Sequence, residues 1–150
     1  MKKLNKFKFL FFALLLLAGA SCKVDKIKDV TEPVKDISGS WRIIKATRNG
    51  TDLTTVVDTN IYSISKFRIN FSGGKYTITN PLPFLVTGDG TYALDNPQYA
   101  FTITFSATGS TTPVSTAFSY PIVDGTRVLN LVFSPGCPQT TYTYSLEKVN

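Results

Sequence analysis

Apolar and polar side chains alternate along most of the chain after residue 37. Phe67, Ile69 and Phe71, for example, are separated by polar residues, and the same period of two recurs in the segments that follow. This alternation is typical of strands with one buried and one solvated face, and the abundance of Thr, Tyr, Phe, Val and Ile agrees with it. The pattern predicts eight strands, near residues 40–48, 65–72, 75–79, 87–94, 98–105, 115–122, 126–134 and 140–148.

Turn-forming residues stand between these predicted strands. Gly73-Gly74 separates the second strand from the third, and Asp124-Gly125 separates the sixth from the seventh. The Asp-Gly pair suits a type I′ turn, in which both central residues take a positive φ. Asn49-Gly50 ends the first strand, and Asp95-Asn96-Pro97 separates the fourth from the fifth. Residues 51–64 fit either a short helical turn or a loop over one end of the fold.

Eight consecutive antiparallel strands, each apolar on one face, must cover that face. They can close into an up-and-down barrel or divide into two packed sheets. Short hairpins between sequence neighbours favour a meander, so we expect an all-β, eight-stranded antiparallel up-and-down barrel over residues 38–150. That length is sufficient for one domain of this kind.

The first 21 residues differ from the rest of the chain. Four lysines within residues 2–8 precede an unbroken apolar run over residues 9–18, and the small residues 19–21 follow. This is the three-part plan of a secretory signal peptide. The apolar run is shorter than the roughly 20 residues that a membrane-spanning helix needs. We therefore assign residues 1–21 to a signal peptide.

Cys22 stands directly after this segment. Ala20-Ser21-Cys22 after a Leu-rich run resembles the bacterial lipobox, although Gly19 occupies the position where Leu is usual. The resemblance implies cleavage before Cys22, acylation of Cys22, and membrane attachment through that lipid. Two or three acyl chains give stable anchoring, whereas one gives only marginal binding. The alternative is ordinary signal cleavage that leaves Cys22 as a free thiol.

Residues 22–37 are mixed in charge, poor in aromatics and interrupted by Pro33. We interpret them as a solvated tether between the lipid and the domain. The chain holds 16 Lys and Arg against 10 Asp and Glu, but four of the basic residues belong to the signal peptide. Its removal leaves 12 basic against 10 acidic residues. No basic stripe survives, so we expect no nucleic-acid partner.

The chain contains no His and only two Cys. A His base, a Ser-His or Cys-His couple and a His-ligated metal are therefore all excluded. No acidic pair is spaced as an acid/base couple or a metal cluster. We predict no enzymatic activity, no cofactor and no metal. We interpret Cys137 as a turn or small buried residue rather than a nucleophile, because the chain has no His that could lower the pKa of its thiol.

Gly39-Ser40-Trp41 opens the first predicted strand. It resembles the G-x-W motif at the start of lipocalins, small barrels whose Trp plugs the closed end beside a basic residue. The resemblance implies a structural plug formed by Gly39 and Trp41, with Lys148 or Arg127 as the cation. Such a contact is worth about 0.5–2 kcal/mol.

The whole plan resembles the small lipocalin-like lipoproteins of Bacteroidota, many of unknown function. The lipobox, the short tether, the G-x-W motif and the stretch Asn49-Gly50-Thr51-Asp52-Leu53-Thr54 carry this resemblance. It implies a lipid-anchored monomer of the cell envelope, on the periplasmic or outward face of the outer membrane.

A barrel of eight strands either holds one small ligand or is filled by its own side chains. We expect a small apolar or amphipathic ligand in the barrel or at its mouth, oriented by aromatic and phenolic side chains. The predicted ligand-binding residues are Phe67, Phe71, Tyr76, Tyr92, Phe101, Phe118, Tyr120 and Tyr142.

The alternative is an interaction module that binds an envelope protein or a glycan through its loops. The connection over residues 81–86 is unusually apolar, and exposed apolar patches mark contact surfaces. The same segment also fits a loop folded over the mouth of the barrel. The internal volume of the barrel and the polar groups that face it would separate the two hypotheses.

Overall fold

The structure is a computed structural model that describes residues 31–54, 63–82, 86–137 and 139–149. Its described part is all-β, and no helix there is long and apolar enough to cross a membrane. The strands are β1 (Gly39–Arg48), β2 (Thr51–Asp52), β3 (Arg68–Ser72), β4 (Lys75–Thr79), β5 (Gly90–Leu94), β6 (Thr102–Ala107), β7 (Val114–Ser119), β8 (Ile122–Val123), β9 (Thr126–Phe133) and β10 (Tyr142–Lys148).

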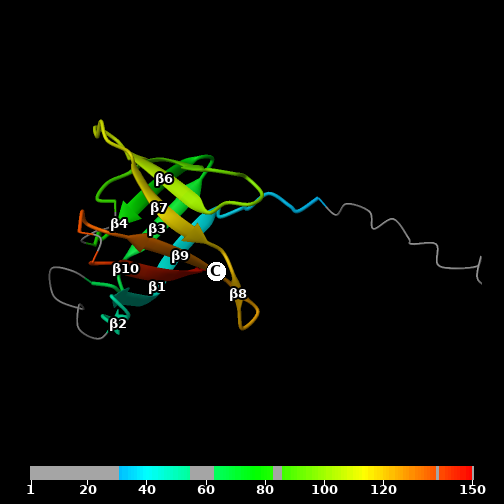
Figure 1. Ribbon diagram of the computed structural model, residues 1–150. Coiled ribbons are helices and arrows are strands. Elements are labelled where there is room, and N and C mark those ends of the chain that lie inside the picture. The colour runs from blue at the N-terminus through cyan, green and yellow to red at the C-terminus, as the bar shows by residue number, and fades with distance from the viewer. Residues whose placement is uncertain (1–30, 55–62, 83–85, 138, 150) are drawn as a thin grey trace, which may run out of the picture. The chain divides into compact units, whose positions relative to one another are not determined.

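Eight of these strands form a closed antiparallel barrel (Figure 1). Their order around the barrel is β1-β3-β4-β5-β6-β7-β9-β10, and β10 returns to pair with β1. Trp41 is paired with Lys148 at this closure, and the register shifts once, between Ile43 and Lys45. The predicted eight-stranded up-and-down barrel is therefore confirmed. The short β2 and β8 are hairpin extensions of β1 and β9.

The predicted hairpin turns have the backbone that their residues favour. Asp124 and Gly125 have φ values of 48° and 79°, as a type I′ turn requires, and Asn49 and Gly50 repeat this at 48° and 82°. The predicted sixth strand is shorter than expected, because Pro121 interrupts the run and separates β7 from β8. Proline has no N–H to contribute to a ladder.

The inward positions of the strands form one hydrophobic core. Fully buried side chains of the largest volume are Trp41, Tyr76, Phe67, Phe71, Phe105, Ile37, Ile69, Ile103, Leu129, Leu131 and Leu146. The apolar positions of the alternating pattern therefore face the barrel interior, and bulky rings occupy that interior. Ile37 shows that the fold begins earlier than expected, because the end of the predicted tether packs into the core. A compact unit indeed runs from Pro33 onward.

Strand pairing defines two ends of the barrel. At one end, here the base, the start of β1, the end of β10 and the turn at residues 73–74 meet. At the other end, here the mouth, lie the described parts of the connections that follow β1, β4, β6 and β9. The chain enters the barrel from residue 33 at the base (Figure 1).

Candidate functional site

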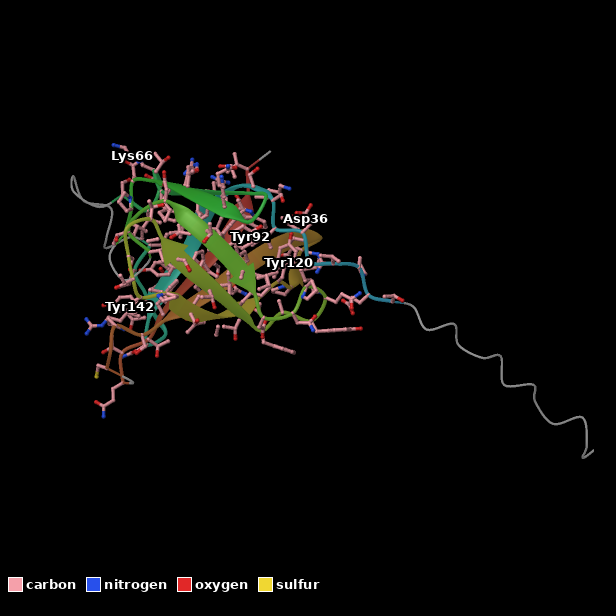
Figure 2. All side chains as sticks on the ribbon, turned by 90° about the horizontal axis from the view of Figure 1, so that it is seen from above. Asp36, Lys66, Tyr92, Tyr120 and Tyr142 are labelled. Carbon is pink, nitrogen blue, oxygen red and sulfur yellow. The ribbon has the colours of Figure 1, made fainter. Side chains whose placement is uncertain are left out.

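Trp41 closes the base. Its side chain is fully buried, and its indole Nε1 donates a hydrogen bond of 2.8 Å to the carbonyl of Ile37. The edge of the Trp41 ring meets Tyr120, with centroids 5.9 Å apart. The Tyr120 hydroxyl donates to the carbonyl of Asp36 at 3.1 Å, and Figure 2 shows these two residues side by side. The segment 36–41 is thereby fastened across the base.

The cation at the base lies over Tyr120. The guanidinium of Arg127 is 5.2 Å from the centroid of that ring, and its Nη1 donates to the Tyr120 carbonyl at 3.0 Å. Arg127 therefore reaches Trp41 through Tyr120. Lys148 is paired with Trp41 in the ladder, and its aliphatic stem lies against Gly39. A Cβ on Gly39 would stand 2.5 Å from Lys148 Cε, and the φ of +116° also favours glycine there.

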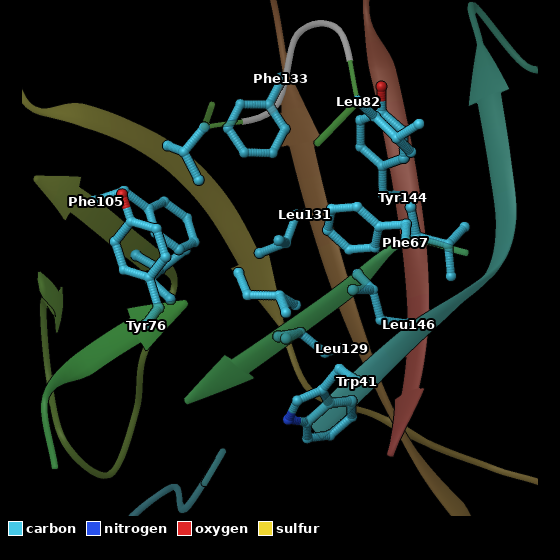
Figure 3. Close-up of a cluster of buried hydrophobic side chains, with 14 of the residues drawn as sticks. Trp41, Phe67, Tyr76, Leu82, Phe105, Leu129, Leu131, Phe133, Tyr144 and Leu146 are labelled. Atoms are coloured by element: carbon cyan, nitrogen blue, oxygen red, sulfur yellow. The ribbon is translucent and has the colours of Figure 1, made fainter. Parts of the chain in front are cut away.

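The predicted ligand-binding residues divide between the two ends. Phe71, Tyr76 and Tyr92 gather around Phe105, with centroid distances of 4.9 Å from Phe71 to Tyr92 and 5.1 Å from Tyr76 to Phe105. Phe67 is fully buried elsewhere in the core, and Figure 3 shows it apart from Tyr76 and Phe105. Tyr142 is buried on β10 near the mouth, with the guanidinium of Arg48 6.0 Å from its ring centroid.

The remaining three predicted residues line a pocket of about 250 Å³ at the base. Phe118 and Tyr120, whose ring centroids are 6.2 Å apart, line it together with the exposed Phe101 and Tyr99 and with Lys35. Figure 2 shows Tyr120 and Tyr142 toward opposite sides of the barrel. The eight predicted residues therefore do not form one site.

The expected inward orientation of Phe101 is wrong. Its side chain is 74% exposed, and β6 begins only at Thr102. The Asp95 carboxylate accepts hydrogen bonds from the N–H groups of Phe101 and Thr102, at 3.0 and 3.1 Å. These bonds hold the pKa of Asp95 below its usual value, and the bond from Thr102 has the largest effect. The carboxylate thus fixes residues 95–101 as a loop, which breaks the alternation before Phe101.

The aromatic cluster ends at the mouth. Figure 3 places Trp41 at one end of the buried cluster and Phe133, Leu82 and Tyr144 at the other, with the hydroxyls of Tyr76 and Tyr144 pointing away from Trp41. Burial, together with a smaller effect of the neighbouring Tyr142, raises the pKa of Tyr144 to about 12. Phenols inside the mouth therefore remain protonated donors at neutral pH.

Tyr76 is the exceptional polar group of the barrel. Its side chain is 1% exposed, and its hydroxyl has no hydrogen-bond partner among the described residues. Burial raises the pKa of Tyr76, and the Asp89 carboxylate raises it further. A buried donor without a partner costs about 1–3 kcal/mol. Such a group in a native fold calls for an explanation, such as a ligand or an ordered water.

A pocket of about 150 Å³ opens at the mouth beside this cluster. Phe105, the ring that contacts Tyr76, forms its inner wall. Its other walls combine apolar side chains with hydroxyls, from Val86, Thr87, Ala107, Ser110, Thr112 and Val114. Phe105 and Val86 were absent from the predicted site. Apolar and polar residues alternate in β6, and this alternation indicates that Phe105 faces inward. Val86 belongs to a connection in which no such alternation occurs.

Other predictions from the sequence fall on surface or undescribed segments. Cys137 is a free, exposed residue in the connection after β9, where its carbonyl accepts a hydrogen bond of 2.7 Å from the Ser134 hydroxyl. Of the apolar connection 81–86, residues 83–85 lie outside the described residues, as do Cys22 and the signal segment. The described residues contain no group of three acidic or Cys side chains placed to hold a metal.

Comparison with known proteins assigns the chain to a family. No curated protein and no solved structure matches the chain significantly. Residues 18–147 match a family described as a domain of unknown function, DUF5004. This match spans the barrel and also the segment around Cys22. Because it covers most of the sequence, the chain belongs to the DUF5004 family of small β-barrel domains of unknown function.

Proposed function

We propose that this protein is a non-enzymatic binding module of the bacterial cell envelope. A lipid on Cys22 attaches it to the outer membrane, and its barrel holds a small amphipathic ligand at the mouth. The observation that carries the binding proposal is the Tyr76 hydroxyl, which is buried, points toward the mouth and has no hydrogen-bond partner in the described part of the chain. The signal segment, the lipobox-like residues and the tether support the location.

The geometry limits the ligand to a narrow class. A volume near 150 Å³ accepts an apolar group about the size of benzene. Phe105 and Val86 offer apolar contact to such a group, and hydroxyls of Thr87, Ser110 and Thr112 stand at the outer wall. Tyr76 contacts Phe105 but does not line the pocket itself, so a ligand that reaches past Phe105 would accept a hydrogen bond from its hydroxyl. The fitting molecule therefore has a compact apolar body and at least one carbonyl, ether or hydroxyl oxygen.

The proposal is tested by recovering the ligand from its source. The chain from residue 23 onward, purified without acylation, is incubated with an envelope extract, and the retained small molecules are identified by mass spectrometry. We expect one class of compound to be enriched. Tyr76→Phe should retain about tenfold less, since one hydrogen bond to a buried donor is worth about 1 kcal/mol or more.

Tyr99→Phe is the matched control, because it deletes the same hydroxyl from an exposed ring at the base. It should retain as much compound as the wild type. An empty wild-type barrel would overturn the proposal. Equal retention by wild type and Tyr76→Phe would overturn the role of that hydroxyl.

A further inference from the structure

Exposed apolar side chains are concentrated at the base. Most of the large apolar residues that the described chain exposes lie there, and only Ile44 and Val114 lie elsewhere. Phe101, Val34 and Ile122 are 74, 64 and 60% exposed. The exposed residues of the base, here the basal apolar surface, are Val34, Tyr99, Phe101, Ile122, Val123 and Val149.

Four separate segments supply this surface. Val34 belongs to the entering chain, which is fastened to the loop of Tyr99 and Phe101 by the hydrogen bond from Lys35 N–H to the Pro97 carbonyl, 2.7 Å. Ile122 and Val123 form β8, which extends past the barrel at the same end (Figure 1). Val149 follows β10, and its N–H donates to the Ser40 carbonyl at 2.8 Å.

The fold itself does not use these side chains. They lie in connections, in the short β8 and in segments that flank β1 and β10, and they are exposed rather than part of the core. Clustered exposed apolar residues mark an interaction surface. Lys35 borders the basal pocket, and Arg127 and Lys148 lie at the same end. Aliphatic and aromatic side chains flanked by Lys and Arg are typical of proteins that rest on a bilayer interface.

We infer that the basal apolar surface contacts a lipid bilayer. The course of the chain favours a bilayer over a protein partner, because the chain reaches the barrel at this end. Only 11 residues separate Cys22 from Val34, a span of at most about 40 Å. A lipid on Cys22 would therefore hold the base close to the membrane. This last step rests on the proposed anchor, whereas the surface itself does not depend on acylation.

Contact at the base gives the molecule an orientation. Acyl chains on Cys22 would hold the protein at the membrane, and a second, apolar contact would fix which end of the barrel faces the bilayer. With the base on the bilayer, the mouth and its pocket point away from it. The ligand of the mouth would then arrive from the aqueous side.

The test uses a fluorophore that reports apolar surroundings. The barrel closes within residues 33–149, so the unacylated chain from residue 23 onward contains the whole fold. One sample carries the dye NBD on the native Cys137 near the mouth, and another carries it on Val123→Cys in a Cys137→Ser background. Vesicles contain phosphatidylethanolamine and phosphatidylglycerol in a ratio of 3 to 1. We expect blue-shifted, brighter emission from the base label alone.

Substitutions then identify the side chains that contact the bilayer. Phe101→Ser should lower vesicle partitioning in flotation about tenfold, and Phe101→Ser with Ile122→Ser should lower it further. Ile44→Ser, an exposed apolar residue away from the base, is the matched control and should bind as the wild type does. Binding should persist in 0.5 M salt, because apolar contact is not screened.

Four outcomes would overturn the inference: no vesicle binding by the wild-type chain, an equal response of both labels, equal binding by Phe101→Ser and Ile44→Ser, or complete loss of binding in salt. The chain could also bind a ligand at the mouth and not bind vesicles. That result would leave the proposed binding function intact and reject the basal contact alone.

Discussion

The base and the mouth of the barrel satisfy their polar groups in opposite ways. At the base, Trp41 donates to Ile37 and Tyr120 donates to Asp36, so both buried or half-buried aromatic donors have partners within the chain. The Tyr76 hydroxyl, which points toward the mouth, is buried with no hydrogen-bond partner among the residues that the structure describes. The comparison teaches that one tyrosine hydroxyl fastens the fold at the base, whereas another is left for the ligand that we propose.

Removing Trp41 should have the largest effect, because it deletes the centre of the base. Trp41→Ala should lower the free energy of unfolding by about 3–5 kcal/mol, the usual cost of emptying such a site. Guanidinium denaturation followed by circular dichroism measures it. Trp41→Phe, which keeps most of the volume but loses the bond to Ile37, should cost less. An unchanged denaturation midpoint for Trp41→Ala would contradict the role of the base.

A second variant tests how tightly the strands approach near the mouth. A Cβ on Gly90 would stand 2.1 Å from the Ser106 carbonyl oxygen. Gly90→Ala should therefore destabilise the barrel by about 1–3 kcal/mol, the range for overpacking. Gly88→Ala is the matched control, since a Cβ there meets nothing within 4 Å. Thermal unfolding of the two variants should differ clearly, and equal midpoints would disprove the close approach.

The phenols of the mouth should make stability depend on alkaline pH. Burial raises the pKa of Tyr144 to about 12, whereas an unfolded Tyr titrates near 10. Between these values the unfolded chain loses the proton and the folded chain keeps it, so stability falls as pH rises from about 10 toward 12. Urea unfolding from pH 8 to 11.5 should show this fall, and Tyr144→Phe should reduce it. A slope unchanged by Tyr144→Phe would exclude this residue as a source.

The smallest expected effects compare the two cation–π contacts. Arg127→Ala at the base should cost about 0.5–1 kcal/mol, because Arg127 lies 5.2 Å from the Tyr120 centroid and also bonds its carbonyl. Arg48→Ala near the mouth, where the distance to the Tyr142 centroid is 6.0 Å, should cost less. Urea denaturation of both variants measures the difference. A larger loss from Arg48→Ala would reverse the expected order.

Much of the barrel could be predicted from the sequence because local patterns specify it. The glycine turn at residues 73–74 and the alternation of residues 75–79 give β4 its observed bounds. Prediction failed where a side chain acts across a loop. The Asp95 carboxylate captures the N–H groups of Phe101 and Thr102, and no period in the sequence reveals that capture.

The candidate site was less predictable than the fold. Alternation indicated that Tyr76 faces inward, and it does. The missing partner of its hydroxyl depends on what neighbouring strands place within reach, which sequence alone does not give. The separation of Tyr120 from Tyr142 likewise follows from strand direction around the barrel, because β7 approaches the base at its end and β10 begins near the mouth.

Pairing of Trp41 with Lys148 joins the first and last barrel strands. A chain made from its N-terminus onward therefore cannot close the barrel until β10 has been made. Before then β1 has no partner on one side, and its unpaired backbone is open to association with other chains. The seam is long-range in sequence, which slows folding. Factors that shield nascent chains would act during this interval, and they would have little left to bind once the two strands meet.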